Sequence, residues 1–265
     1  MEHLFKAWPD FVKAAKVSHV LLLADYDGTL TPIAPTPVDA ILSPEVRKKL
    51  TTLMKKPAFS VGVISGRAIE ELKSMVAIKG IYYAGNHGLE IEGPGLKYII
   101  PGAEATRRIM AALARELEAA LKNISGIIIQ EKGLSLSVHY RLVKPEETET
   151  VTAAVRRVTA PRVNRGEIIV YGMKKNWEIR PPVVWNKGKA AEFIGSEIKA
   201  KLRLPRLLTI YLGDDTTDED AFRVIRQPDG WSVYIGPENE TSAAGFYLDS
   251  PAEVEILLDR LIQLK

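Results

Sequence analysis

The sequence predicts an α/β protein with a doubly wound, mostly parallel sheet of the Rossmann type and a smaller inserted α+β domain. Three patterns lead to this prediction. Apolar runs without polar alternation, which are typical of buried parallel strands, end in acidic or small polar residues. Strand and helix patterns alternate in the first and last parts of the chain. The middle part differs, because each of its two helices is followed by two strands.

The first part of the chain alternates between strands and helices. Its first strand is the apolar run from Val20 to Ala24. Ser43 is a favourable N-cap, and Pro44 suits the first position of the helix that follows. The expected elements are a strand at 20–24, a helix at 44–56, a strand at 59–64, a helix at 68–76 and a strand at 81–84. This rhythm predicts parallel strands, helices on both faces and right-handed crossovers.

The middle part is expected to form an inserted domain with an antiparallel sheet. Its elements are a helix at 103–122, strands at 127–130 and 135–140, a helix at 146–158, and strands at 168–171 and 177–180. Gly133 is the turn residue between the first two strands. We expect the insert to span residues 103–182, with hinges at 101–102 and 181–182.

The last part returns to alternation and completes the larger domain. Its expected elements are a helix at 187–201, a strand at 207–212, a helix at 218–225, a strand at 231–235 and a helix at 252–264. The larger, catalytic domain is therefore expected to comprise residues 1–102 and 183–265.

Composition favours an ordinary globular protein of the cytoplasm. Of 265 residues, 46% are hydrophobic and 26% are charged. No apolar run approaches the length needed to span a bilayer, and the N-terminus lacks the layout of a signal peptide. The chain has no cysteine, which excludes disulfides and thiolate metal sites. No membrane partner is expected. The oligomeric state stays open, and a monomer is compatible with the composition.

Charge is distributed unevenly along the chain. Residues 105–182 contain 14 Lys and Arg against 8 Glu and no Asp, a net +6 in a chain whose formal net charge is +3. The remainder is therefore net −3. These cations are either solvated helix faces or a basic lid that attracts an anionic ligand over an acidic site. Nucleic acid is not an expected partner, because no basic stripe interleaved with aromatic residues occurs.

Two acidic clusters follow apolar runs that are far apart in the sequence. Asp25 and Asp27 come directly after the first strand, and residues 213–220 follow the strand at 207–212. Asp and Gly are also common in turns, so either cluster alone is ambiguous. The carboxyl ends of parallel strands meet at one edge of a sheet, where such folds bind ligands. Carboxylates crowded there need a cation, and Mg²⁺ prefers oxygen ligands and usually brings phosphate with it.

The chain resembles the haloacid dehalogenase-like phosphatases. Their four motifs are matched in order by Asp-Tyr-Asp-Gly-Thr at 25–29, Val-Ile-Ser-Gly-Arg at 63–67, Asn-Lys-Gly-Lys at 186–189 and Gly-Asp-Asp-Thr-Thr-Asp at 213–218. Three further stretches resemble the trehalose-6-phosphate phosphatases, namely Gly-Asn-His-Gly at 85–88, Trp-Glu-Ile-Arg-Pro at 177–181 and the run at 213–222. Related sugar phosphatases share parts of these stretches.

The resemblance implies roles for the acidic residues. Asp25 is the expected nucleophile, which would form an aspartyl-phosphate. Asp27 is the expected general acid and base, and its backbone carbonyl is an expected metal ligand. Asp214 is the expected third protein ligand of Mg²⁺. Asp218 either binds the metal or orients a metal-bound water, although it can also cap the helix that begins there. The role of Asp215 stays open.

The resemblance also implies a phosphate site. Ser65 and Gly66 are expected to hold phosphate at a strand-to-helix turn, although Ser-Gly is also common in such turns. Arg67 either contacts phosphate or pairs with the acidic helix that follows it. Lys187 is expected to contact both phosphate and Asp25, with Lys189 as the alternative.

Residues of the insert are expected to bind the sugar. These are Lys132, Arg141, Lys174 and Glu178, and Lys175 is an alternative to Lys174. Glu178 is informative, because an acceptor suits sugar hydroxyls and is not needed to attract an anion. Asn86 and His87 are expected to bind substrate at the seam between the domains, although a lone histidine is more often structural.

The sequence thus predicts a Mg²⁺-dependent phosphatase that hydrolyses trehalose 6-phosphate, a small-molecule sugar phosphate. A phosphatase of the mannosylglycerate or sucrose phosphate type is the alternative hydrolase. A sugar phosphomutase or phosphotransferase on the same core is a second alternative. A non-catalytic sugar-phosphate sensor is a third, and the intact Asp25 and Asp27 argue against it.

Overall fold

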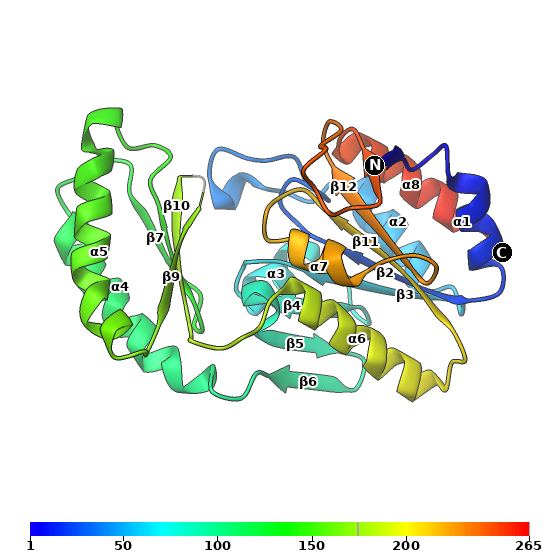
Figure 1. Cartoon of the computed structure of the whole chain (residues 1–265), viewed down its shortest axis with the longest axis horizontal. Helices are drawn as coiled ribbons and strands as arrows, with labels where there is room; N and C mark the ends of the chain where they lie inside the picture. The colour runs from blue at the N-terminus through cyan, green and yellow to red at the C-terminus, as the bar shows by residue number, and fades with distance from the viewer. Residues whose placement is uncertain (174, 265) are drawn as a thin grey trace. The chain divides into compact units, whose positions relative to one another are not determined.

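The structure of the chain, a computed structural model, describes residues 1–173 and 175–264. Its residues form two compact units (Figure 1). The core unit comprises Met1–Tyr98 and Trp185–Lys265, and the inserted unit comprises Ile99–Val184. The α/β class predicted from the sequence is confirmed, with a mostly parallel sheet in the core unit.

The core unit is built on a nine-stranded sheet with the order β1-β13-β12-β11-β2-β3-β4-β5-β6. Neighbours from β1 to β4 are parallel, and β5 runs antiparallel to β4. The strands are β1 (Glu2–His3), β2 (His19–Ala24), β3 (Phe59–Ile64), β4 (Tyr82–Gly85), β5 (Glu90–Gly93), β6 (Leu96–Ile99), β11 (Leu207–Gly213), β12 (Gly230–Ile235) and β13 (Phe246–Leu248). Because β11 and β3 flank β2, the residues after these three strands lie at one edge.

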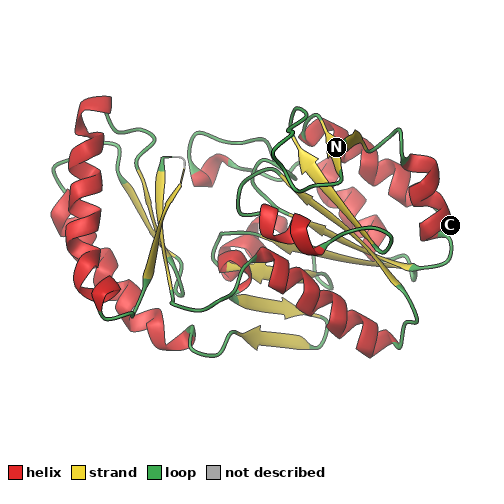
Figure 2. Ribbon diagram, viewed as in Figure 1, coloured by secondary structure: helices red, strands yellow, loops and turns green. Residues whose placement is uncertain are grey.

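Helices cover both faces of this sheet (Figure 2). They are α1 (Trp8–Ala15), α2 (Pro44–Met54), α3 (Ile69–Val76), α6 (Lys187–Leu202), α7 (Glu219–Val224) and α8 (Pro251–Gln263). The side chains of β2 alternate between two apolar clusters. Leu22 packs in the cluster that includes α1, α2, α3 and α8, whereas Leu21 and Leu23 pack in the cluster that includes α6 and α7. Both faces of β2 are therefore buried, which explains its continuous apolar run.

The inserted unit has the predicted order of a helix, two strands, a helix and two strands. Its four-stranded antiparallel sheet has the order β7-β8-β10-β9. The elements are α4 (Arg107–Leu121), β7 (Ile128–Glu131), β8 (Leu136–His139), α5 (Thr148–Asn164), β9 (Ile169–Met173) and β10 (Asn176–Arg180). Gly133 has a φ of +78° in the turn between β7 and β8, as its predicted turn role requires. Helices α4 and α5 share one apolar cluster with one face of the sheet.

Several elements differ from the sequence prediction. Strands β1, β5, β6 and β13 and helix α1 were not predicted. Each of these strands has four residues or fewer, which is too short for a clear periodic pattern. The predicted helix at 103–122 begins later, at Arg107, after a short 3₁₀ turn. The predicted helix at 146–158 is wrong at its end, because α5 continues to Asn164 with Pro161 inside it.

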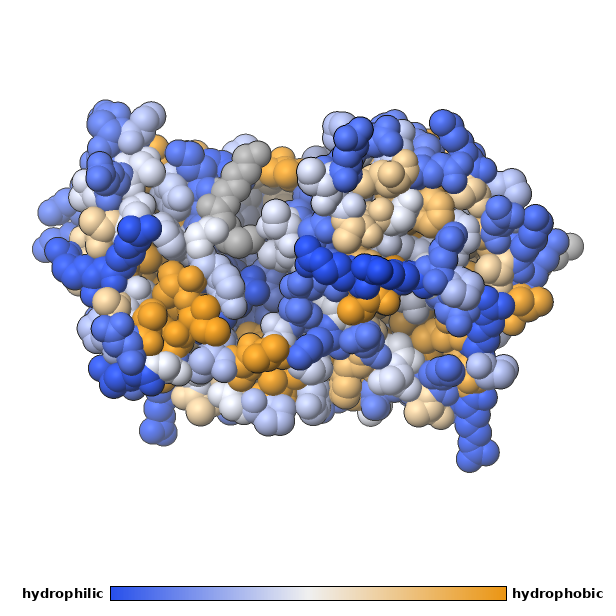
Figure 3. All heavy atoms as spheres, in the orientation of Figure 1, coloured by the Kyte–Doolittle hydropathy of each residue, from blue (hydrophilic) through white to orange (hydrophobic). Residues whose placement is uncertain are grey.

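The surface mixes polar and apolar residues. On the face drawn in Figure 3, hydrophobic residues form separate patches among hydrophilic ones. Exposed large apolar residues include Val38, Ile41 and Tyr171. Among the helices of the described residues, none is long and apolar enough to cross a membrane.

Candidate active site

The candidate active site lies where β2, β3 and β11 end. Ala24, the last residue of β2, pairs with Leu212 on one side and with Val63 on the other. The backbone N–H of Asp25 then donates a 2.9 Å hydrogen bond to the Leu212 carbonyl. Parallel pairing therefore brings together the strand ends that carry the predicted acidic residues and Ser65.

Asp25 is held on both carboxylate oxygens. Its Oδ2 lies 2.5 Å from Nζ of Lys187, and its Oδ1 accepts a 2.6 Å hydrogen bond from the N–H of Tyr26. The side chain is buried. Burial raises the pKa of Asp25 well above its ordinary value, although the Lys187 cation opposes this shift. A buried carboxylate in such a place needs cations around it to stay ionised.

Lys187 supplies one of these cations. It is the first residue of α6, whose N-cap is Asn186, and its side chain is fully buried between Asp25 and Asp218. Burial alone would lower the pKa of Lys187, but the carboxylates of Asp218 and Asp25 raise it well above its ordinary value. Lys187 therefore stays protonated. Lys189, the alternative from the sequence, is exposed.

Asp218 is a buried anchor. Its Oδ1 accepts hydrogen bonds from Lys187 Nζ at 2.8 Å and from the Tyr211 hydroxyl at 2.7 Å. Its Oδ2 accepts from the N–H groups of Asp214 and Asp215, both at 3.2 Å. A Cβ on Gly213 would lie 2.3 Å from the Asp218 side chain, so the close approach requires glycine. Asp218 thus holds both Lys187 and the loop that follows β11 in position.

The donor set of this site fits a divalent cation. Asp25, Asp214 and Asp218 each offer a carboxylate oxygen, and these oxygens lie within 4.8 Å of one another. Burial, with the charges of Asp218 and Asp215, raises the pKa of Asp214 to about 8. A cation would favour the ionised form of this buried carboxylate, and Mg²⁺ prefers oxygen ligands of this kind.

Residues of the first motif shape this cluster. Thr29 donates a 3.1 Å hydrogen bond to Oδ1 of Asp214. Gly28 has a φ of +78°, and a Cβ on it would lie 2.1 Å from the Asp214 carboxylate. Only glycine therefore leaves room for Asp214 at this position.

Asp27 points to a different partner from Asp25. Its two oxygens accept from Nη2 and Nε of Arg67, at 2.7 and 2.8 Å. The Asp27 side chain is 42% exposed. Arg67 also donates to Glu71 and to the Pro37 carbonyl. Of the two roles considered for Arg67, the structure shows the pairing with the helix that follows it, through Glu71, and adds Asp27 as a second partner.

The turn of the predicted phosphate site is hydrogen-bonded to the turn that carries Asn86 and His87. The N–H of Asn86 donates to the Arg67 carbonyl at 2.7 Å, and the N–H of His87 donates to the Ser65 carbonyl at 2.9 Å. A Cβ on Gly66 would lie 2.5 Å from the His87 ring. Glycine there lets the imidazole rest against the turn, so these five predicted residues belong to one local structure.

Two of the predicted sugar-binding residues of the inserted unit, Lys132 and Glu178, are in contact with each other. Glu178 of β10 accepts from Nζ of Lys132 at 3.2 and 3.3 Å and from the Ser137 hydroxyl, and all three side chains are buried. Arg141 is exposed in the turn after β8. The prediction for Lys174 lies outside the described residues. The alternative, Lys175, places Nζ 5.7 Å from the centre of the Tyr140 ring.

Three contacts of the site were missed from the sequence. Tyr211 lies in an apolar run, where its pattern indicates only a buried strand residue. Thr29 belongs to the first motif, but nothing in the sequence pairs it with Asp214. Ser137 lies in a strand, and its contact with Glu178 depends on the register between β8 and β10. No local pattern signals such pairings.

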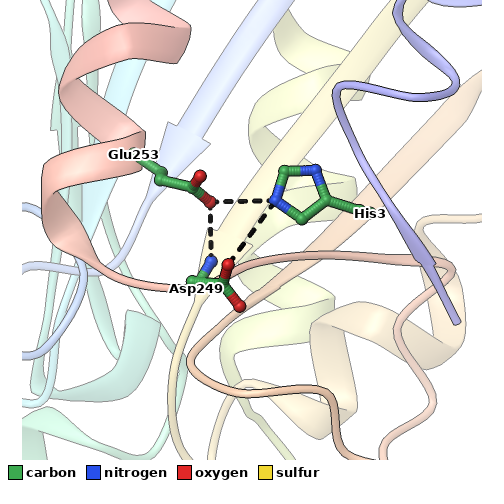
Figure 4. A group of neighbouring side chains, drawn as sticks. All are labelled: His3, Asp249 and Glu253. Atoms are coloured by element: carbon green, nitrogen blue, oxygen red, sulfur yellow. Dashed lines mark hydrogen bonds and ion pairs between the residues drawn. The ribbon is translucent and has the colours of Figure 1, made fainter.

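A second group of potential metal ligands lies elsewhere in the core unit (Figure 4). Nε2 of His3 lies 3.0 Å from Glu253 and 3.8 Å from Asp249. Nδ1 of His3 accepts a hydrogen bond from the N–H of Phe5, so Nε2 is the donor in the hydrogen bond to Glu253. Glu253 also accepts from the N–H of Asp249. These hydrogen bonds account for the group as a link between β1 and α8.

Solved structures share the fold of this chain. The C-terminal domain of a trehalose-6-phosphate phosphatase from C. albicans has a TM-score of 0.77 at 24% identity, with 97% of each chain covered. A haloacid dehalogenase-like hydrolase from Bacteroides thetaiotaomicron has a TM-score of 0.62 at 15% identity, with 92% of this chain and all of that chain covered. At these identities, the likeness shows the fold.

The family is shown by the sequence itself. The trehalose-phosphatase family model matches residues 23–252. Trehalose-phosphate phosphatase B of Arabidopsis thaliana is 31% identical over 268 residues, which cover 97% of this chain and 70% of that protein. The chain belongs to the trehalose-phosphatase family and is a phosphoric monoester hydrolase.

Proposed function

We propose that this protein is a Mg²⁺-dependent phosphatase that hydrolyses trehalose 6-phosphate through an aspartyl-phosphate on Asp25. The observation that carries the proposal is the buried contact between Asp25 and Lys187 at the edge of the sheet. A nucleophilic carboxylate has to approach an anionic phosphoryl group, and a fixed cation beside it offsets the repulsion. The family supports the substrate, because its named relatives act on trehalose phosphate.

In the first step, a carboxylate oxygen of Asp25 attacks phosphorus, and the bond from phosphorus to the sugar oxygen breaks. The leaving oxygen takes a proton from Asp27, so that trehalose departs as a neutral alcohol. Asp27 is suited to this role because its side chain is 42% exposed, whereas Asp25 is buried. The ion pair with Arg67 has to open before Asp27 carries a proton.

In the second step, water attacks the phosphorus of the aspartyl-phosphate. Asp27, now unprotonated, accepts a proton from this water, and the bond to Asp25 breaks to release inorganic phosphate. Lys187 keeps its charge in both steps, because Asp218 holds its Nζ at 2.8 Å. Asp25 and Asp27 therefore end the cycle in the states in which they began it.

The metal is expected to be held by the carboxylates of Asp25 and Asp214 and by the backbone carbonyl of Asp27. A bound Mg²⁺ would neutralise charge on the phosphoryl oxygens. Asp218 already accepts four hydrogen bonds. We therefore propose that Asp218 positions the groups around the metal site and does not bind the metal directly.

Substrate binding is divided between phosphate and sugar. Ser65, Gly66, Arg67 and Lys187 are proposed for the phosphate end, and Asn86 and His87 are proposed as further substrate-binding residues. Lys132, Arg141, Lys174 and Glu178 are proposed for the sugar, and the contact between Lys132 and Glu178 supports a shared site for two of them. A cytoplasmic location stays a prediction of the sequence.

A panel of phosphorylated sugars tests this proposal. Purified protein with Mg²⁺ should release inorganic phosphate from trehalose 6-phosphate with a higher kcat/KM than from sucrose 6-phosphate or mannosylglycerate phosphate. A preference for either of these two would reassign the substrate. Phosphate label that moves to a second sugar, rather than to water, would replace the phosphatase with a phosphotransferase.

A further inference from the structure

We propose that Tyr171 of β9 is a specificity-determining residue, whose ring stacks on a glucose ring of the substrate. This inference rests on the proposed function, because it needs a sugar substrate. It adds an aromatic contact to the polar residues proposed above, and it names the chemistry that this contact recognises.

Strand register places Tyr171 beside Glu178. Glu178 pairs directly with Tyr171 of β9 on one side and with Ser137 of β8 on the other. Residues that are directly opposite in an antiparallel pair point to the same face of the sheet. The neighbours of Glu178 along β10, Trp177 and Ile179, pack in the apolar cluster with α4 and α5. Successive side chains alternate, so Glu178 and Tyr171 share the face away from these helices.

The two side chains on this face differ in exposure. Glu178 is buried, and the hydroxyl of Ser137 and Nζ of Lys132 fix its carboxylate. Tyr171 is 42% exposed, although the removal of a large aromatic ring from water is favourable. Tyr171 therefore keeps an accessible aromatic surface beside a carboxylate that is held in a fixed position.

Arg180 connects these two groups. Its guanidinium carbon lies 5.1 Å from the centre of the Tyr171 ring, and its Nε lies 4.0 Å from Oε1 of Glu178. A cation at this distance interacts favourably with an aromatic face and restricts the ring. The ring is thus oriented before a ligand arrives, which reduces the entropy lost on binding.

This arrangement matches the surface of a pyranose. A glucose ring has hydroxyl groups around its edge and patches of C–H groups on its two faces. The C–H patches pack well on an aromatic ring, while the hydroxyls need acceptors such as Glu178. A single exposed aromatic residue needs no special explanation by itself. The direct pairing of Tyr171 with the buried acceptor is what points to a sugar.

The test compares Tyr171→Ala and Tyr171→Phe on trehalose 6-phosphate and on p-nitrophenyl phosphate, which has no sugar. Aromatic stacking predicts a loss in kcat/KM of roughly two- to tenfold for Tyr171→Ala on the sugar phosphate, mostly through KM. Tyr171→Phe keeps the ring and should retain wild-type values. Both variants should keep wild-type activity on p-nitrophenyl phosphate. Trehalose, added as a product inhibitor, should bind the alanine variant more weakly by the same factor.

Val163→Ala is the matched control, because Val163 is also 42% exposed but lies on α5. It should leave both substrates unaffected. The stacking proposal is wrong if Tyr171→Ala lowers kcat/KM equally on both substrates or leaves kcat/KM for trehalose 6-phosphate unchanged. It is also wrong if Tyr171→Phe lowers kcat/KM as much as Tyr171→Ala does. A wild-type protein that fails to hydrolyse trehalose 6-phosphate would instead remove the proposed function, so the two failures are distinguishable.

Discussion

The hydroxyl of Tyr211 donates a 2.7 Å hydrogen bond to Oδ1 of Asp218, the same oxygen that accepts from Lys187. Burial, together with the Asp218 charge, raises the pKa of Tyr211 well above its ordinary value, so the phenol keeps its proton and donates. Tyr211 therefore acts on Lys187 through Asp218, although it lies in the apolar part of β11.

Replacing Tyr211 with phenylalanine should lower kcat by roughly tenfold, because a hydrogen bond to a charged group is worth about 1.5–3 kcal/mol and the lysine loses part of its support. KM for p-nitrophenyl phosphate should change little. Tyr83→Phe is the control, since its buried hydroxyl donates at 2.7 Å to the Ile78 carbonyl. An equal loss of kcat in both variants would indicate that Tyr211 matters only for packing.

Asp25→Asn should abolish turnover, because an amide cannot form the acyl phosphate. The unfolding midpoint should be nearly unchanged, since the substitution removes a charge from a crowded carboxylate group. Asp27→Asn should lower kcat by about 10²–10⁴-fold, the usual contribution of general acid–base catalysis. A beryllium fluoride complex should place the mimic on Asp25, and density on another carboxylate would overturn the assignment of the nucleophile.

Removal of metal by EDTA should inactivate the enzyme, and added Mg²⁺ should restore activity. Mg²⁺ should also raise the midpoint of thermal unfolding, because a ligand that binds only the folded state stabilises it. Asp214→Asn should weaken both effects. Asp220→Asn is the control, because Asp220 lies on α7 and pairs with Arg223 outside the cluster. Full activity after thorough chelation would contradict a metal requirement.

Glu178→Gln should reduce kcat/KM for trehalose 6-phosphate by roughly one to two decades, because each lost hydrogen bond from a charged group costs about 1.5–3 kcal/mol. Hydrolysis of p-nitrophenyl phosphate should stay at the wild-type level. The exchange keeps the shape of the side chain but weakens its role as an acceptor. Equal losses on the two substrates would show that Glu178 only stabilises the inserted unit.

The ion pair between Glu116 and Arg162 should make stability depend on pH. Two hydrogen bonds from Arg162 lower the pKa of Glu116 below 4.5, its ordinary value. Such a group stabilises the fold above its unfolded-state pKa, and this contribution is lost as pH falls through the lower folded-state pKa. Because the pair is partly exposed, the contribution is about 0.5 kcal/mol.

Glu116→Gln should therefore lower the free energy of unfolding slightly at pH 7, and the difference from the wild type should shrink below pH 4.5. Urea denaturation followed by circular dichroism measures it. Glu118→Gln is the control, since Glu118 lies on the same helix and forms no ion pair among the described residues. A difference that persists unchanged at acid pH would assign the effect to something other than the ion pair.

Much of the fold follows from local patterns. The apolar runs of β2 and β11 are buried on both faces, so they were visible as strands without any knowledge of their neighbours. The N-cap at Ser43 was also local, and its hydroxyl accepts from the N–H of Val46 as a cap should. Short strands such as β5 and β6 were missed, because pairing rather than periodicity defines them.

By itself, the sequence determined the α/β class, the inserted α+β unit, and the position of acidic residues, a serine and a lysine at element ends. Tertiary structure alone decided their partners. Asp25 and Lys187 are 162 residues apart in the chain, and their contact depends on the packing of α6 beside β2. The pairing of Arg67 with Asp27 and that of Tyr211 with Asp218 likewise depend on directions of side chains at neighbouring strand ends. Such directions follow from packing and burial in three dimensions, which no local pattern of residues encodes.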